Sequence, residues 1–321
     1  MGARRYLLSK ILQALATLLF VLTFNFFLFR VLPGDPIGLL ARSQRLTDAD
    51  IAEQRATLGL DQPLPQQYVT YVGQTMTGNL GVSLRTTKPV TEIIRSPLGP
   101  TLLLVGLGTL FATVLGILIG IKGGWERGSR FDTSSLYGSL VLYSMPEGWL
   151  GMLLLITFAG ILGWFPAGGF ETGGETGMAR IVDIANHLFL PVLTLTLGYI
   201  GEYAIIMRSS MVDTVNEDFV TIARAKGVPE RAIRRDHVVP NAFLPTFTLI
   251  FLSLGVVLGG AVVVEAVFSW PGIGLLTYNA IKTLDYPVIQ GVFLLSSAAV
   301  ILCNLIADVA YGYMDPRVRE A

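Results

Sequence analysis

The chain has 321 residues, of which 52% are hydrophobic and only 14% are charged. Soluble domains carry about 25% charged residues, so this composition excludes an ordinary soluble protein and indicates a chain built for a lipid bilayer. The net charge is zero, which gives no reason to expect nucleic acid as a partner, and the single cysteine, Cys303, excludes an internal disulfide.

Long apolar segments run through the whole chain. The first, Ile11–Phe29, follows a basic flank and is close to the ~20 residues that cross a bilayer. It exceeds the apolar core of about 7–15 residues found in a cleavable signal peptide, so we expect a helix that is retained. Five further segments are apolar enough to cross: Leu98–Ile121, Ser134–Trp164, Ile184–Met207, Leu244–Val264 and Tyr286–Ala307.

The number of spans depends on the third segment, which Pro146 and Glu147 interrupt, so that it is either one kinked span or two. Cytoplasmic loops are rich in Lys and Arg, and this bias decides the question. With six spans and a cytoplasmic N-terminus, fourteen basic residues lie inside, and the short outer loops hold only Arg180 and Lys282. A seventh span would place an arginine-rich loop outside. We therefore expect an all-α polytopic membrane protein with six transmembrane helices and both termini cytoplasmic.

The segment between the first two spans, residues 34–97, is long and extracytoplasmic in this topology. Thr47–Asp50 is close to a capping box, which predicts a helix running to Gly59. A second helix is predicted over Gln66–Met76, followed by a turn at Gly78–Gly81. Long loops without structure are uncommon, so we expect a small folded flap and not a solvated linker.

The most polar internal stretch, Asp218–Pro245, lies between two strongly apolar segments. Its first part predicts a short helix that Asp218 caps and Gly227 ends. Phe219, Ile222 and Ala223 are spaced at i, i+3 and i+4 and fall on one face of that helix.

A second helix is expected to follow directly. Pro229 suits its first turn, and Glu230 lies near its positive end. Its basic face consists of Arg231, Arg234 and Arg235. Two short helices joined at a glycine would present a small apolar knob on the cytoplasmic surface, and such a shape fits a socket in another protein.

This stretch resembles the cytoplasmic "EAA" loop of binding-protein-dependent ABC permeases. Ala223, Gly227 and Pro240 match the general pattern, although Thr221-Ile222-Ala223 replaces Glu-Ala-Ala. The run TIARAKGVPERAIRRDHVVPNAFLP is similar to the peptide and nickel branch of that family. Motifs of the same branch are spread over nearly the whole chain: Arg30–Pro36, Leu58–Pro63, Gly78–Gly81, Gly259–Gly291, and Asp308 with Asp315-Pro316-Arg317.

The resemblance implies the organisation and partners of the chain. Residues 1–97 would form the first span and the flap, 98–316 the permease domain with a coupling loop at 208–245, and 317–321 a cytoplasmic tail. The implied partners are a homologous second permease, two ATPase subunits and an extracytoplasmic solute-binding protein in a bacterial inner membrane. The residues implied to dock on an ATPase are Phe219, Thr221, Ile222, Ala223, Arg224, Ala225, Lys226 and Gly227.

The chain carries no motif for ATP binding or for catalysis. A P-loop needs a Gly-Lys pair, and none of the five lysines follows a glycine. We therefore expect no cofactor and no metal on this chain, with ATP and Mg bound by the partner ATPases. The two histidines, His187 and His237, are far apart, and neither His-Glu-x-x-His nor Gly-x-Ser-x-Gly occurs. These absences argue against a membrane hydrolase.

Ionisable groups within spans are costly and are therefore functional candidates. Glu147 follows Pro146 in the middle of the third span, where it would line the pathway and meet a cationic group such as a peptide amino terminus. The alternative is a carboxyl group satisfied by a neighbouring helix or at the membrane interface. Glu202 and Glu265 are expected at membrane interfaces, and Asp285 is expected to cap a helix starting near Pro287. Trp270, Pro271 and Gly272 predict a rigid turn that shapes the outer mouth.

The sequence thus predicts the transmembrane permease subunit of an ATP-driven importer, with dipeptides or oligopeptides as the expected solute. Nickel or glutathione is the alternative solute for the same architecture. A secondary transporter would need ion-coupling residues of its own, and a structural or assembly protein would have no pathway.

Overall fold

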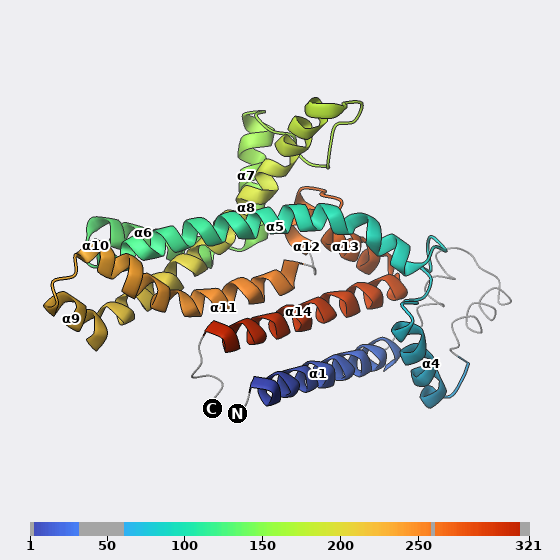
Figure 1. Ribbon diagram of the computed structural model, residues 1–321. Coiled ribbons are helices and arrows are strands. Elements are labelled where there is room, and N and C mark those ends of the chain that lie inside the picture. The colour runs from blue at the N-terminus through green and yellow to red at the C-terminus, as the bar shows by residue number, and fades with distance from the viewer. Residues whose placement is uncertain (1–2, 32–60, 258–260, 315–321) are drawn as a thin grey trace. The chain divides into compact units, whose positions relative to one another are not determined.

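The computed structural model describes residues 3–31, 61–257 and 261–314 of the chain (Figure 1). Within these ranges the protein consists of helices and turns, with one isolated bridge between Val82 and Pro89 and no strand. The prediction of an all-α fold is therefore confirmed. The chain divides into two compact units, Met1–Gly99 with Gly272–Ala321, and Pro100–Pro271.

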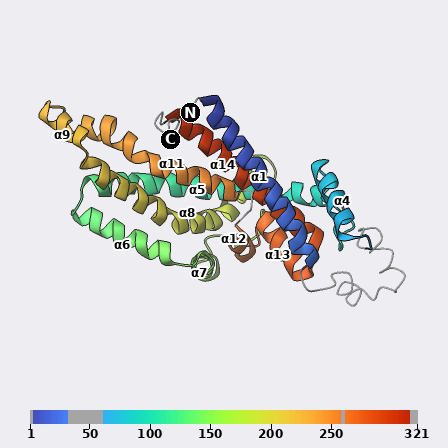
Figure 2. The same cartoon turned by 90° about the horizontal axis from the view of Figure 1, so that it is seen from below.

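The first unit is built on a pair of long helices. Its elements are α1 (Ala3–Val31), α4 (Leu64–Met76), the start of α5 (Val90–Trp125), α13 (Ile273–Thr283) and α14 (Tyr286–Met314). Helices α1 and α14 lie side by side and run in opposite directions (Figure 1, Figure 2). The Lys10 ammonium is 3.1 Å from the Asp308 carboxylate, and the Asn25 amide donates to the carbonyl of Gln290 at 3.2 Å. The start of α1 therefore lies beside the end of α14.

The flap is described in part. The predicted helix at Gln66–Met76 is confirmed as α4, and the predicted turn follows it, with positive φ at Gly78 and Gly81. The expected helix from Thr47 to Gly59 falls outside the described residues. Tyr68 and Tyr71 of α4 pack their rings on Phe26 of α1, at centroid distances of 5.3 and 5.6 Å. Aromatic packing therefore joins the flap to the first long helix.

A buried carboxylate fixes the turn that precedes α5. Asp285 lies between α13 and α14, and it accepts hydrogen bonds from the hydroxyl of Ser83 at 2.5 Å and from the amide of Leu84 at 3.1 Å. Asp285 directly precedes α14, as predicted, and its carbonyl accepts the amide of Ile289 at 3.1 Å, but its side chain bonds this turn and not the helix. The role of Asp285 is structural, as expected, but it joins two distant segments of the chain.

The second unit begins with most of α5 and ends before α13. Its other elements are α6 (Arg130–Ser144), α7 (Glu147–Leu154), the π-helix η1 (Leu155–Ile161), α8 (Gly177–Val215), α9 (Asp218–Ala225), α10 (Glu230–Ala232), the π-helix η2 (Ile233–Val238), α11 (Val239–Val257) and α12 (Val262–Val267). One apolar core includes Leu104, Leu195, Phe268 and Trp270. A second core lies around Met207 and Met211 of α8.

Small residues let α5 and α8 approach closely. They recur at every fourth position of α5, so that they share one face: Gly108, Ala112, Gly116, Gly120 and Gly124. A Cβ atom on Gly120 would stand 2.6 Å from the Cβ of Met207 and 2.7 Å from the carbonyl of Ala204. Such small-residue faces are the usual basis of close helix packing in membranes, where the hydrophobic effect does not drive helices together.

Four helices of the described chain are long and apolar enough to cross a bilayer: Arg5–Arg30, Val90–Trp125, Gly177–Val215 and Tyr286–Val309. The expected third span is a helix pair, Arg130–Ser144 and Glu147–Ile161, which is bent by 100° and gives a fifth candidate if it counts as one. The break falls at Met145 and Pro146, where the sequence predicted an interruption. The expected span Leu244–Val264 is helical to Val257, and its residues 258–260 are outside the described ranges.

Candidate coupling site and pathway residues

The polar stretch that follows α8 begins with the short helix α9, as predicted. The second helix is not a separate short one, because α10, η2 and α11 follow one another without a break from Glu230 to Val257. Helix α9 lies at one end of the second unit, beyond the ends of α8 and α11 (Figure 1, Figure 2). It begins at Asp218, and its N-cap is Glu217, whose side chain makes no capping bond. The expectation that Asp218 caps the helix is therefore wrong by one residue, although its charge still suits the positive end of the helix.

Gly227 ends α9, as the sequence predicts, and it does so in the left-handed conformation. Its φ is +75°, its amide donates to the carbonyl of Arg224 at 2.9 Å, and the amide of Val228 donates to the carbonyl of Ala223 at 3.2 Å. These two bonds form a Schellman motif, which satisfies carbonyl groups at the end of the helix. A Cβ on Gly227 would meet no atom within 4 Å, so the requirement for glycine lies in the backbone conformation.

The inner face of α9 is anchored in the second unit. Val220 is fully buried and Ala223 is 8% exposed. They belong to one apolar cluster with Met207 and Met211 of α8, Ile233 and Val238 of η2, and Ala242 of α11. We call this cluster the seat of the loop. Because the seat includes residues of the long helices α8 and α11, a displacement of α9 has to displace both of them as well.

The outer face of α9 carries two large apolar side chains. Phe219 is 38% exposed and Ile222 is 53% exposed. The structure thus divides the predicted apolar face, because Ala223 points inward with Val220 while Phe219 and Ile222 point outward. The other residues implied for docking are all exposed, namely Thr221, Arg224, Ala225, Lys226 and Gly227. The sequence analysis does not include Val220 in the apolar face of this helix, although its i, i+3 spacing to Ala223 would indicate it.

Charged side chains surround this knob. Arg224 reaches across the glycine turn to Glu230, with 2.9 Å between the closest nitrogen and oxygen atoms. Arg235 binds Asp236, and this hydrogen bond lowers the pKa of the Asp236 carboxyl group below its ordinary value. The Arg234 guanidinium lies over the ring of Trp125, 5.8 Å from its centroid. One of the three arginines of the predicted basic face therefore already has a partner within this chain. Exposed pairs of this kind contribute little to stability, and their main effect is to set the charge of the surface.

Glu147 lies at the 100° bend between α6 and α7, directly after Pro146, which is the N-cap of α7. Its side chain is half-buried, and its Cγ would be 3.3 Å from a Cβ placed on Gly198 of α8. Glu147 is therefore held against α8, as the alternative of a neighbouring helix expects, while a part of it remains exposed.

The predicted outer turn is anchored by its tryptophan. Trp270 is fully buried, and its indole nitrogen donates to the carbonyl of Pro100 at 2.9 Å. Glu265 is also fully buried and accepts a hydrogen bond from Thr101 at 3.0 Å, so this carboxyl group has a partner inside the protein. Pro271 is exposed, and Gly272 is the N-cap of α13. Among the described residues, no three His, Cys, Asp or Glu side chains are grouped as metal ligands would be.

Long apolar helices, joined to an exposed apolar surface at the end of two of them, indicate a membrane protein with a surface for a partner. Residues 112–320 match the family described as "Binding-protein-dependent transport system inner membrane component", and residues 3–104 match its N-terminal region. The chain belongs to this family.

Relatives match over nearly their full length. The chain is 42% identical over 317 residues to a putative peptide permease protein of Brucella suis, covering 98% of this chain and 99% of the relative. It is 38% identical over 312 residues to a di/tripeptide transport system permease of Pseudomonas aeruginosa, covering 92% and 93%. It is also 38% identical over 315 residues to a glutathione transport system permease of Salmonella typhi, covering 98% of each.

Proposed function

We propose that this protein is the transmembrane permease subunit of an ATP-driven importer of dipeptides or oligopeptides in a bacterial inner membrane. Its proposed partners are a homologous second permease, two ATPase subunits and an extracytoplasmic solute-binding protein. ATP and Mg are bound by the ATPase subunits, and this chain carries no cofactor. The observation that carries the proposal is the knob of Phe219 and Ile222, which is exposed on a rigid seat in a chain of this family.

The proposed topology has six spans with both termini in the cytoplasm. It is supported by the pairing of Lys10 with Asp308, because helices whose opposite ends meet have their termini on one side of the membrane. The basic residues Arg224, Arg231 and Arg235, exposed near the knob, favour the cytoplasm for that side of the chain.

In the proposed mechanism, closure of the ATPases on ATP pulls on the knob. Val220 and Ala223 transfer the displacement to Met207 and Met211 of α8, since buried side chains at close-packed density cannot slide past one another freely. The membrane helices then change from an inward-facing to an outward-facing arrangement and receive solute from the binding protein. Such rigid-body rearrangements are a common form of coupling between domains.

We expect Ile222→Asp to lower the affinity for the ATPase subunits by about tenfold or more, because a charge replaces an apolar anchor in the proposed socket. Copurification of the tagged permease with ATPase chains measures the effect. Asn216→Asp, at an exposed position that precedes α9 and lies outside the docking residues, is the matched control for added charge. Equal recovery of ATPases with the Ile222→Asp variant and with the unmodified chain would remove the knob from the interface.

We expect Glu147→Gln to slow the uptake of peptides that have a free amino terminus, since the amide cannot attract an ammonium group as the carboxylate does. A loss of about fivefold or more is expected for a free dipeptide, and little change for its N-acetylated form. Both solutes are measured with the same proteoliposomes. Unchanged rates and affinities for the free dipeptide would exclude the proposed role of this carboxylate.

Glutathione is the second candidate solute, because a relative 38% identical to this chain is named for it. Competition of unlabelled glutathione and unlabelled dipeptides against a labelled dipeptide distinguishes the two. Stable copurification with ATPase chains separates both from a secondary transporter, and loss of uptake on deletion separates them from an assembly protein.

A further inference from the structure

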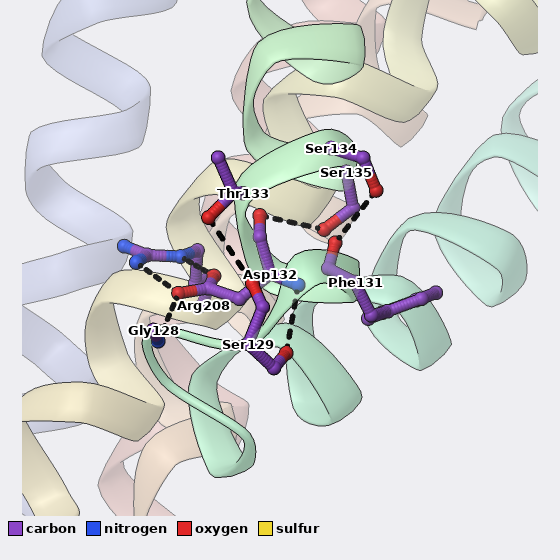
Figure 3. A network of polar contacts seen from close by, with 8 residues as sticks. All are labelled: Gly128, Ser129, Phe131, Asp132, Thr133, Ser134, Ser135 and Arg208. Atoms are coloured by element: carbon purple, nitrogen blue, oxygen red, sulfur yellow. Dashed lines mark hydrogen bonds and ion pairs between the residues drawn. The ribbon is translucent and has the colours of Figure 1, made fainter.

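An ion pair between a buried carboxylate and a partly exposed arginine joins the inner ends of α6 and α8. Arg208 binds Asp132 with two nitrogens, Nε to Oδ1 at 2.5 Å and Nη2 to Oδ2 at 2.9 Å (Figure 3). Asp132 is only 3% exposed, and its Oδ2 also accepts the amide of Gly128 at 2.9 Å. The hydroxyl of Ser129 accepts the amide of Asp132 at 3.1 Å and so caps α6. One carboxylate therefore holds the turn after α5, the start of α6 and the side of α8.

The pair lies directly against the seat of the coupling loop. Arg208 follows Met207 and is three residues before Met211, and both methionines belong to the seat. The backbone of α5 is in close contact here as well, since a Cβ on Gly124 would be 2.9 Å from the carbonyl of Arg208. A displacement of α8 by the loop therefore reaches the Arg208 guanidinium within one helical turn.

From the ion pair, α6 continues along α8 to the bend. Seven residues beyond Asp132 lies Ser139, and seven residues before Arg208 lies Gly201. A Cβ on Gly201 would stand 2.4 Å from the carbonyl of Ser139, so the two helices are nearly in backbone contact there. The ion pair and this contact hold α6 to α8 at two points about two turns apart, and the next element after the bend begins with Glu147.

Stability alone gives a weak reason for such a pair. A buried ion pair gains about as much from its attraction as it loses by desolvation, and well-packed apolar residues often replace it without loss. What a bidentate arginine–carboxylate pair supplies is fixed geometry, because both partners are planar and both bonds have to be aligned.

We propose that Asp132 and Arg208 are positioning residues that form a strut, which transmits the displacement of the coupling loop from α8 to α6 and so to the bend at Glu147. This inference rests on the proposed function, and it assigns to α6 the motion that α8 receives from the loop.

The test uses the assembled importer, with its ATPases, second permease and binding protein, in proteoliposomes. Asp132→Asn removes the negative charge of the pair, and Arg208→Lys keeps the positive charge but removes the two parallel hydrogen bonds of the guanidinium. The control is Glu126→Gln, which neutralises an exposed carboxylate of the same turn. The readout is the amount of solute imported per ATP hydrolysed. We expect this ratio to fall about tenfold in Asp132→Asn and in Arg208→Lys while ATP hydrolysis continues, and to be unchanged in the control. Unchanged ratios in both strut variants would overturn the proposal, as would a loss of uptake and hydrolysis in equal proportion.

A second measurement needs no disruptive variant. Spin labels at Tyr137 of α6 and Ser209 of α8, both exposed, report the distance between these helices in a chain with Cys303→Ser. A strut keeps that distance constant between the nucleotide-free and the ATP-bound importer, and a change between the two states would overturn the proposal. Failure of the unmodified importer to take up any solute on ATP would instead refute the proposed function, so the two failures are distinguishable.

Discussion

Replacing Gly227 with valine is expected to abolish coupled solute uptake while the membrane helices remain folded. The glycine has a φ of +75°, which a β-branched residue adopts only at a cost of about 1–3 kcal/mol. Relief of this strain breaks the bonds from the amides of Gly227 and Val228 to the end of α9. The knob of Phe219 and Ile222 then loses its fixed orientation, because the turn that holds it no longer closes.

The measurement is uptake of labelled solute, together with ATP hydrolysis by the same assembled importer. Gly227→Asn is the matched control, because asparagine tolerates the left-handed conformation better than any β-branched residue. A Cβ at this position meets no atom within 4 Å, so a bulky side chain has room and the two variants differ mainly in backbone preference. A valine variant that imports solute at the rate of the unmodified protein would show that the geometry of this turn is not needed for coupling.

The local pattern of the sequence was sufficient to predict the turn but not the orientation of α9. Gly227 ends the helix as its residue type indicates, since glycine alone occupies positive φ without strain. The apolar residues of α9 do not indicate which face of the helix is buried, because Phe219 and Ile222 are as hydrophobic as the buried Val220. Which of them face inward depends on Met207 and Met211, whose position relative to the loop is a tertiary feature.

The same limit applies to the partners of the buried acids. Asp285 precedes α14 as the sequence predicts, but Ser83, which donates to its side chain, is 202 residues away in the sequence. Thr101, which donates to Glu265, is 164 residues away. Periodicity and capping rules describe neighbours within a few residues, so they cannot supply partners of this kind.

The break at Pro146 was predictable in position but not in angle. Proline cannot continue a helical ladder, and the sequence therefore places an interruption there. The bend of 100° depends in addition on how α7 packs, and Gly148 of α7 leaves room for Val263 of α12 at 2.5 Å from its Cβ position. Close contacts of this type become visible only when the helices are placed together.

Introducing a methyl group at Gly120 is expected to destabilise the membrane domain more than any other single alanine substitution on the small-residue face of α5. The new Cβ would stand 2.7 Å from the carbonyl of Ala204 and 2.9 Å from the amide of Arg208. These are backbone atoms, so α5 and α8 have to separate along their length, which overpacking studies place at about 1–3 kcal/mol. The midpoint of thermal unfolding in detergent, followed by size-exclusion chromatography, measures the loss.

Two glycines of the same helix supply the controls. Gly106→Ala meets no atom within 4 Å, and it should be neutral or stabilising by up to about 1 kcal/mol, because alanine is the better helix former. Gly108→Ala meets only the side chain of Leu195, with Cβ at 2.7 Å and Cδ1 at 3.1 Å. Leu195→Ala keeps the first contact and removes the second, so it should rescue Gly108→Ala only in part. Met207→Ala should not rescue Gly120→Ala, since the contacts with the backbone remain. Rescue by Met207→Ala would mean that side-chain volume, and not the approach of the two backbones, sets the spacing of α5 and α8 where the coupling loop is seated.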